Sequence, residues 1–137
     1  MGRLKIREGT IENCLVWYER ENTAGPKPCR FQIIKFQKHD FRLTELKALL
    51  SASLGVSIRV IKTREIYFTG NVKIYLDTVP DLGTFIEIEA FETDSQNPES
   101  LRKQCDTFFR LLGIRNDQLV SKSYADLMEK PVSKPVV

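Results

Sequence analysis

The sequence predicts an α+β fold in which about six antiparallel strands curl into a β-barrel, with helices packed outside. Its length of 137 residues suits one domain. Six segments alternate polar and apolar residues as strands do, and two others repeat apolar residues at helical spacing. The polar faces of the strands carry charges of both signs. If the sheet curls, these charges line the lumen of a barrel wide enough to hold a ligand.

The first three strands are expected at residues 3–8, 13–20 and 30–35. In the first of them, Lys5 and Arg7 lie on the face opposite the apolar residues, because strand side chains alternate. The segment ENTAGPKP between the second and third strands is rich in turn-forming residues and is predicted to be a loop.

A short helix is expected next, because leucines recur with helical spacing at Leu46, Leu49, Leu50 and Leu54. Thr44 is the candidate N-cap, and Gly55 lies just beyond the end of the helix. Residues 56–68 predict the fourth strand. Gly70 and Asn71 both tolerate positive φ, so a tight hairpin is expected to lead into the fifth strand.

Residues 72–90, VKIYLDTVPDLGTFIEIEA, are the most informative stretch of the chain. They predict two adjacent strands joined by a turn around Pro80 and Gly83. The side chains of one face fall at alternate positions: Lys73, Tyr75 and Asp77 on one strand, and Phe85, Glu87 and Glu89 on the other. A lysine, an aspartate and two glutamates on one face suit the binding of an anion together with a divalent cation.

The clearest helix has Asn97 as its N-cap and Pro98 in its first turn, and Gly113 ends it. Its apolar stripe consists of Leu101, Cys105, Phe108, Phe109 and Leu112. A further short helix is expected at residues 124–128. We expect residues 1–129 to form a single domain and residues 130–137 to be a disordered tail.

The composition excludes several classes of protein. Hydrophobic residues make up 42% and charged residues 28% of the chain, as in ordinary soluble domains, and no apolar run is long enough to span a membrane. A net charge of only +3 does not imply affinity for nucleic acid. The three cysteines lack metal-ligand spacing, which favours a reducing, cytoplasmic location. His39 is the only histidine and falls in a polar turn, so histidine-based catalysis is not expected.

Seven cations are expected to face the barrel lumen: Lys5, Arg7, Arg20, Arg30, Lys62, Arg64 and Lys73. They would repel one another unless an anion binds, and a triphosphate offers a chain of charged oxygens to arginine and lysine. Glu87 and Glu89 are two residues apart and can both reach a magnesium or manganese ion shared with the phosphates. Alternating charges on strands also form solvated faces with cross-strand ion pairs, and the pattern alone leaves this alternative open.

Several stretches, in order along nearly the whole chain, resemble the CYTH domain, or triphosphate tunnel metalloenzyme superfamily. They are LKIRE, LVWYERENTAGPK, IKTREIYFTGNVKIYLDTVPDLGTFIEIEA, LGI and SYADLM. This superfamily includes class IV adenylyl cyclases, thiamine triphosphatases and inorganic triphosphatases. The resemblance implies an antiparallel eight-stranded tunnel that binds a triphosphate, such as ATP, thiamine triphosphate or tripolyphosphate, with magnesium or manganese.

The resemblance also implies roles for individual residues. The phosphate-binding residues would be the seven cations named above. Asp77 would match an acidic residue at the reaction centre, and Glu87 and Glu89 would match the late metal-binding pair. Lys73 stands where the family usually has arginine, so the bidentate fork is lost there. Asp77 and Lys73 are the candidate catalytic residues.

One departure from the family pattern is large. The E-x-E-x-K motif of the family's first strand is absent, since Glu19 and Glu21 are followed by Thr23 at the lysine position. By this analogy the fold is N-terminally incomplete, with about six strands instead of eight. Half of the carboxylate set for the metal would be missing, and the tunnel would have open edges that a homodimer could pair.

Three functions therefore remain open. The first is a metal-dependent domain that hydrolyses a triphosphate or cyclises ATP, impaired by loss of the E-x-E-x-K strand. The second is a catalytically inactive module that binds polyphosphate or nucleotide. The third is a structural domain whose charged face is only solvated.

Overall fold

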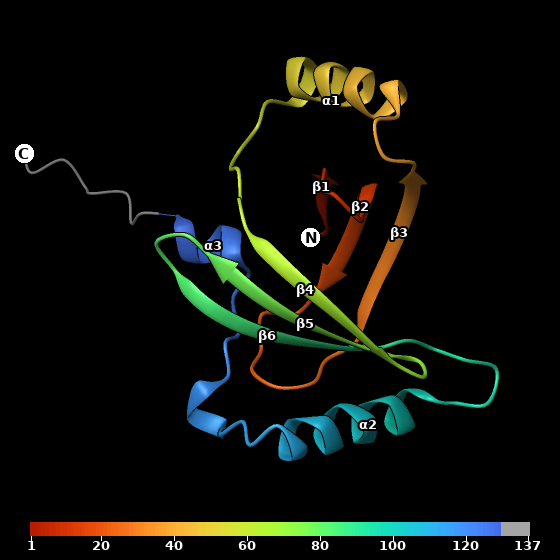
Figure 1. Ribbon diagram of the computed structural model, residues 1–137, viewed down its shortest axis with the longest axis vertical. Coiled ribbons are helices and arrows are strands. Elements are labelled where there is room, and N and C mark those ends of the chain that lie inside the picture. The colour runs from red at the N-terminus through yellow and green to blue at the C-terminus, as the bar shows by residue number, and fades with distance from the viewer. Residues whose placement is uncertain (130–137) are drawn as a thin grey trace, which may run out of the picture. The chain divides into compact units, whose positions relative to one another are not determined.

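The computed structural model describes residues 1–129 and divides into two compact units (Figure 1). The N-terminal unit comprises residues 1–21 and 27–58. The C-terminal unit comprises residues 22–26 and the described residues from 59 onward. Each unit holds one three-stranded antiparallel sheet, with the strands in sequence order.

The sheet of the N-terminal unit consists of β1 (Arg3–Arg7), β2 (Asn13–Arg20) and β3 (Cys29–Phe36), and α1 (Phe41–Leu54) follows it. The N-cap of α1 is Asp40, whose side chain accepts a hydrogen bond from the Arg42 backbone N–H at 3.0 Å. The prediction of Thr44 as N-cap is wrong, because the helix begins a turn earlier, where a carboxylate can reach the N–H groups that the helix leaves without partners. Gly55 ends α1 with a φ of 75°, as predicted.

The sheet of the C-terminal unit consists of β4 (Thr63–Thr69), β5 (Val72–Val79) and β6 (Gly83–Ala90). It is followed by α2 (Pro98–Leu111), the 3₁₀ helix η1 (Asn116–Gln118) and α3 (Tyr124–Met128). Figure 1 shows α2 running beneath this sheet, where it contacts β6. The Asn97 cap and the helix at residues 124–128 are both confirmed.

The fourth strand is shorter than predicted. The sequence predicted it over residues 56–68, but β4 begins at Thr63, which pairs with Thr78 near the end of β5. Residues before Thr63 have no ladder partner on β5, so their alternating pattern is not sufficient to make them a strand. The hairpin after β4 is confirmed, and Gly70 in its turn has a φ of 58°.

The α+β class and the six strands are confirmed, but a closed barrel is not seen among residues 1–129. A barrel needs one continuous ladder of strand pairs. Here β1 to β3 form one meander and β4 to β6 form another, and no strand pairing joins the two sheets within the described residues. That residues 1–129 act as one domain stays a prediction, and the expected tail at residues 130–137 lies outside the described part of the chain.

Buried residues of β5 fix the sheet of the C-terminal unit. Val72, Tyr75 and Val79 are each at most 2% exposed, and Asp77, at 1%, is the one buried charged residue in the part of the chain that the structure describes. Because Tyr75, Asp77 and Val79 alternate along β5, the best-buried face of this strand is also the face that carries charge.

Candidate phosphate-binding site

The register of the C-terminal sheet gathers the predicted charged residues on one face. Across the ladder, Asp77 lies opposite Arg64, Tyr75 lies opposite Glu87 and Lys73 lies opposite Glu89. Residues directly opposite each other on antiparallel strands project to the same side. The sequence-based prediction of one shared face for these residues therefore agrees with the register.

Asp77 is the centre of this face and accepts hydrogen bonds from three side chains. Arg64 donates from Nε to Oδ1 at 2.6 Å and from Nη2 to Oδ2 at 2.5 Å, which is a bidentate pair. Lys62 donates to Oδ2 at 3.1 Å, and the Tyr124 hydroxyl donates to the same oxygen at 2.7 Å. Arg64 Nη2 also lies 2.9 Å from Glu87 Oε2. We call Lys62, Arg64, Asp77, Glu87 and Tyr124 the Asp77 cluster.

The hydrogen bonds of the cluster keep Asp77 ionised. Burial alone raises the pKa of the Asp77 carboxyl, but the hydrogen bonds from Arg64, Tyr124 and Lys62 outweigh burial and lower this pKa to about 2. At neutral pH the carboxylate therefore has no proton to donate as a general acid. The carboxylate accepts the hydrogen bonds of two cations and a phenol, and a catalytic role for Asp77 stays a prediction.

The surroundings shift the pKa values of the cluster's donors in different directions. Burial lowers the pKa of the Lys62 ammonium, and the neighbouring Arg64 contributes to the same effect. Burial, and then the negative charge of Glu87, raise the pKa of the Tyr124 phenol. Arg64 and Tyr124 therefore stay protonated at neutral pH and keep their hydrogen bonds to Asp77.

Two aromatic rings support the cations. The Arg64 guanidinium lies 4.0 Å from the centroid of the Tyr75 ring, and Lys62 Nζ lies 5.0 Å from the centroid of the Tyr124 ring. The Tyr124 ring in turn packs on Phe85, with the centroids 4.9 Å apart. These contacts limit the freedom of both cations, so less side-chain entropy is lost when they bind a ligand.

Glu87 and Glu89, the predicted metal pair, are too few to form a complete metal site. Glu87 is bound to Arg64, and Glu89 accepts a hydrogen bond from the Tyr75 hydroxyl at 2.7 Å. Across residues 1–129 no group of three or more His, Cys, Asp or Glu side chains is placed to hold a metal ion. Magnesium often takes one or two carboxylates and completes its shell with water and substrate phosphates. Glu87 and Glu89 therefore fit a cation that arrives with phosphates, but not one held by the protein alone.

Lys73, predicted to be catalytic, lies apart from the Asp77 cluster. It is four residues from Asp77 along β5, a distance of about 13 Å at the usual rise of a strand. Its ammonium lies 5.4 Å from the centroid of the Phe68 ring and 5.1 Å from that of Phe91. A catalytic role for Lys73 stays a prediction, and the structure gives it a cation–π role.

The N-terminal sheet divides its predicted phosphate ligands between two faces. Lys5 lies opposite Val16 and Arg7 lies opposite Cys14, so both share a face with Arg20 at the end of β2. Arg30 instead lies opposite Glu19, on the other face, and its Nη2 is 2.8 Å from Glu19 Oε2. The prediction that Arg30 shares a face with Lys5 and Arg7 is wrong, because β3 pairs with β2 in a register that turns Arg30 to the opposite side.

The basic residues of this sheet have near neighbours of their own. Arg7 forms an ion pair with Glu12. Lys5 and Arg20 lie over the Tyr18 ring, at 4.7 Å and 5.9 Å from its centroid. A triphosphate bound by these residues would add to contacts already present.

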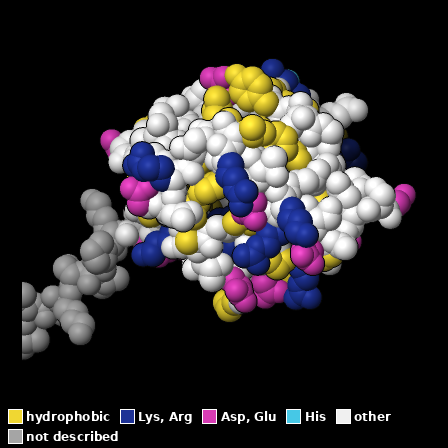
Figure 2. Space-filling view, turned by 90° about the horizontal axis from the view of Figure 1, so that it is seen from below, with side chains coloured by type: hydrophobic (Ala, Val, Ile, Leu, Met, Phe, Trp, Pro, Cys, Tyr) yellow, Lys and Arg dark blue, Asp and Glu magenta, His cyan; other side chains and the backbone are white. Residues whose placement is uncertain are grey.

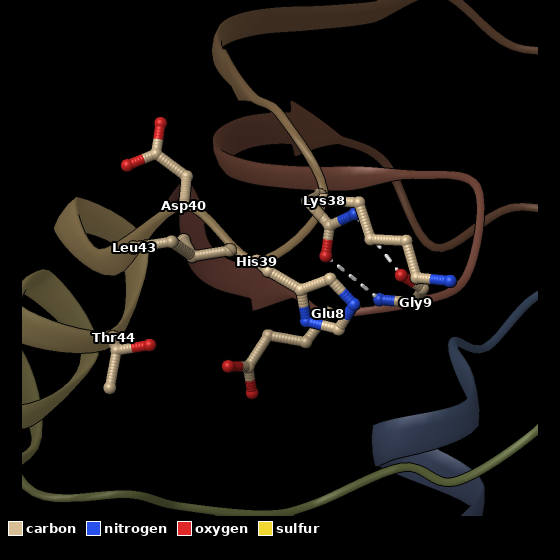
Figure 3. A pocket seen from close by; sticks show the side chains of 8 residues that line it. Glu8, Gly9, Lys38, His39, Asp40, Leu43 and Thr44 are labelled. Atoms are coloured by element: carbon tan, nitrogen blue, oxygen red, sulfur yellow. Dashed lines mark hydrogen bonds between the residues drawn. The ribbon is translucent and has the colours of Figure 1, made fainter.

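A hollow of about 220 Å³ in the N-terminal unit contains none of the predicted site residues. Its lining comprises Glu8, Gly9, Asn13, Lys38, His39, Asp40, Leu43 and Thr44 (Figure 3). Gly9 and Asn13 exchange two hydrogen bonds of 3.1 Å there, and His39 has a φ of 62° in the turn before α1. The hollow follows from the geometry of two turns, and we do not assign it to the site.

Tyr124 is the member of the cluster to which sequence reasoning assigned no role. It lies 47 residues from Asp77 in the chain and begins α3, where Ser123 and Asp126 form a capping box. The capping signal was visible in the sequence and indicated where the phenol begins a helix. It gave no information on which strand the phenol would reach.

Tyr124→Phe is expected to destabilise the protein by about 1–2 kcal/mol, because a buried carboxylate loses one of its donors. The pKa of Asp77 should also rise, since the Tyr124 hydrogen bond helps to lower it. Urea unfolding measures the first effect, and a carbon-13 NMR titration of the Asp77 carboxyl measures the second. Tyr67→Phe is the matched control, because it removes a phenol that donates to the exposed Glu65 at 2.7 Å. If both variants changed the stability and the Asp77 pKa equally, Tyr124 would not be a specific donor to Asp77.

The chain matches one known protein family over most of its length. The family model described as "CYTH domain" matches residues 1–124. The chain belongs to the CYTH family. The Asp77 cluster is therefore a feature of a CYTH domain, and the resemblance noted in the sequence is confirmed.

This CYTH chain is also similar to one curated protein and to two solved structures. It is 30% identical over 66 residues to "Putative adenylate cyclase MJ0240" of Methanocaldococcus jannaschii, a match that spans 48% of this chain and 38% of that protein. Among solved structures, it resembles a conserved hypothetical protein from Pyrococcus furiosus with a TM-score of 0.73 and 18% identity, over 93% of this chain and 75% of that one. The PH1012 protein of Pyrococcus horikoshii OT3 gives a TM-score of 0.70 and 23% identity over the same shares of the two chains. These two likenesses support the fold.

In the space-filling view from below, basic and acidic side chains are interspersed on the visible face, without one continuous basic patch (Figure 2). None of the helices within residues 1–129 has the length and apolar character that crossing a bilayer requires.

Proposed function

We propose that this CYTH domain binds a triphosphate-containing small molecule, with Lys62 and Arg64 as its central phosphate contacts. The observation that carries the proposal is the convergence of these two cations on Asp77, with Glu87 bound beside them. Arg64 is held bidentately by a buried carboxylate, so its guanidinium is fixed in orientation before any ligand arrives. A fixed guanidinium and a lysine point charge are the donors that phosphate oxygens require.

Family membership extends the proposal from phosphate to triphosphate. The CYTH family model spans residues 1–124 and so includes Lys62, Arg64 and the E-x-E segment of β6. Lys5, Arg7 and Arg20 share a face of the N-terminal sheet and are proposed as further phosphate contacts. Closure of the strands into a tunnel, and pairing of open edges in a homodimer, stay predictions.

A divalent cation, magnesium or manganese, is proposed to enter as part of the substrate. When bound, it would neutralise phosphate charge and polarise the phosphorus under attack. Glu87 and Glu89 are the residues that would contribute oxygen ligands to it. Lys62 and Arg64 would stabilise the charge that develops on the phosphate oxygens during reaction.

Two reactions are compatible with this site. In triphosphate hydrolysis, water attacks the terminal phosphorus, the bond to the bridging oxygen breaks and the diphosphate part leaves, so that the terminal phosphoryl group becomes orthophosphate. In ATP cyclisation, the ribose 3′-hydroxyl attacks the α-phosphorus and pyrophosphate leaves. The printed name of the Methanocaldococcus relative favours testing cyclisation first. We propose that turnover is slow, because within residues 1–129 no third His, Cys, Asp or Glu side chain joins Glu87 and Glu89 to hold the cation.

A second candidate function is a module that binds polyphosphate or nucleotide without turnover. It is favoured by one observation: Glu87 and Glu89 both have protein donors as partners, Arg64 and Tyr75. In that case the protein would retain the phosphate contacts while the cation lacks enough ligands for catalysis.

Calorimetric titration with tripolyphosphate tests the proposal. We expect saturable binding with magnesium present, and competition by ATP and by thiamine triphosphate. If neither ATP nor thiamine triphosphate competes, the substrate is restricted to inorganic polyphosphate. Absence of binding with and without magnesium would reject the phosphate site. Assays for phosphate, pyrophosphate and cyclic AMP then separate the two reactions from binding without turnover.

A further inference from the structure

Glu87 occupies one of the positions beside Arg64 at which a phosphate oxygen would bind. Its Oε2 lies 2.9 Å from Arg64 Nη2, and this is the nitrogen that also donates to Asp77. Nη2 carries two N–H donors, so these two carboxylates account for both of them. A phosphate that approaches this side of the guanidinium therefore has to replace one of the two.

The carboxylates of Asp77 and Glu87 differ in how readily an anion can displace them from Arg64. The Asp77 side chain is fully buried and accepts hydrogen bonds from three donors, so its removal would leave a buried ion without partners. The Glu87 side chain is 38% exposed and lies on β6, an edge strand of its sheet. An exposed ion pair contributes little net stability, because water solvates the released carboxylate. Glu87 is the partner that an anion can displace.

The charges of the cluster balance while Glu87 is in place. Lys62 and Arg64 contribute two positive charges, and Asp77 and Glu87 contribute two negative charges. A metal-free triphosphate would displace Glu87 and leave its carboxylate beside the bound phosphate. Like charges so placed cost binding energy. A triphosphate that carries a divalent cation would avoid this cost, because the charge of the cation would offset that of the released carboxylate.

We propose that Glu87 is a built-in competitor of metal-free polyphosphates for Arg64 Nη2 and thereby favours the cation-complexed form of the substrate. The inference rests on the proposed triphosphate function and assigns a specificity-determining residue within it. This role of Glu87 differs from its proposed role as a metal ligand, because Glu87 competes with phosphate even when no cation is present.

The test is titration of Glu87→Gln with tripolyphosphate in the presence of a chelator. Glutamine keeps the size of the side chain and removes the charge that competes with phosphate. We expect this variant to bind metal-free tripolyphosphate about tenfold more tightly than the unmodified protein. Addition of magnesium should tighten binding to the unmodified protein by a larger factor than binding to the variant.

Glu89→Gln is the matched control, because Glu89 lies two residues away on the same face of β6 but is bound to Tyr75 instead of Arg64. Its affinity for metal-free tripolyphosphate should stay within twofold of the unmodified protein. The inference is overturned if Glu87→Gln leaves metal-free binding unchanged or weakens it while the unmodified protein binds the magnesium complex. If no variant binds tripolyphosphate under any condition, the proposed function and the inference both fail.

Discussion

Asp77→Ala is expected to destabilise the protein by about 3–5 kcal/mol, the usual cost of removing one partner from a buried ion pair. Asp77 is 1% exposed, and its loss would remove the acceptor shared by Lys62, Arg64 and Tyr124. Arg64 would keep Glu87, whereas the Lys62 ammonium would lose its carboxylate. Urea unfolding at neutral pH measures the change in the free energy of unfolding.

Asp94→Ala is the control for this substitution, because Asp94 is exposed in the loop before α2 and should leave stability unchanged. The pH dependence gives a second check. The pKa of Asp77 in the folded protein, about 2, lies below its ordinary value of 3.8. Its stabilisation is therefore present above pH 4 and is lost as pH falls through 2. The deficit of Asp77→Ala should shrink across that range, and a deficit that is constant with pH would contradict this account.

Arg64→Ala is expected to weaken binding of the magnesium–tripolyphosphate complex at least tenfold. The guanidinium is 10% exposed and already oriented by Asp77, so a phosphate bound to it has little ordering left to supply. The affinity of Arg64→Lys should lie between those of Arg64→Ala and the unmodified protein, because lysine keeps the charge but loses the bidentate fork. Calorimetry measures the affinities, and circular dichroism confirms that each variant is folded.

Arg30→Ala is the matched control for Arg64→Ala. Arg30 was also expected to contact phosphate, but it lies on the opposite face of the N-terminal sheet from Lys5 and Arg7, with its side chain 81% exposed beside Glu19. Its removal should change the affinity less than twofold. An equal loss of affinity in Arg30→Ala and Arg64→Ala would show that both act through net charge, and the assignment of a local site would then fall.

Local patterns in the sequence were sufficient for most of the features that depend on a single segment. Alternation in residues 72–90 placed Lys73, Asp77, Glu87 and Glu89 on one face, and the ladder of β5 and β6 agrees. The Asn97 cap and the Gly70 turn were also predictable, because each depends on a backbone geometry within a few residues. The Thr44 cap failed because Asp40 offered a stronger acceptor one turn earlier.

Relations between segments were harder to predict. Arg30 alternates along β3 as expected, but only the register with β2 determines which face it takes, and a shift by one residue reverses that face. The number of strands was predicted correctly, yet their division into two meanders depends on which edges pair. No feature within a single strand specifies that choice.

The sequence by itself determined the family, the strands and the kinds of charge that this CYTH domain carries on them. Only the tertiary structure decided which of those charges meet: Tyr124 reaches Asp77 from 47 residues away, and Arg64 is shared between a buried carboxylate and an exposed one. The physical reason is that alternation and capping are properties of neighbouring residues. Hydrogen bonds between distant side chains depend instead on the packing of whole elements against one another.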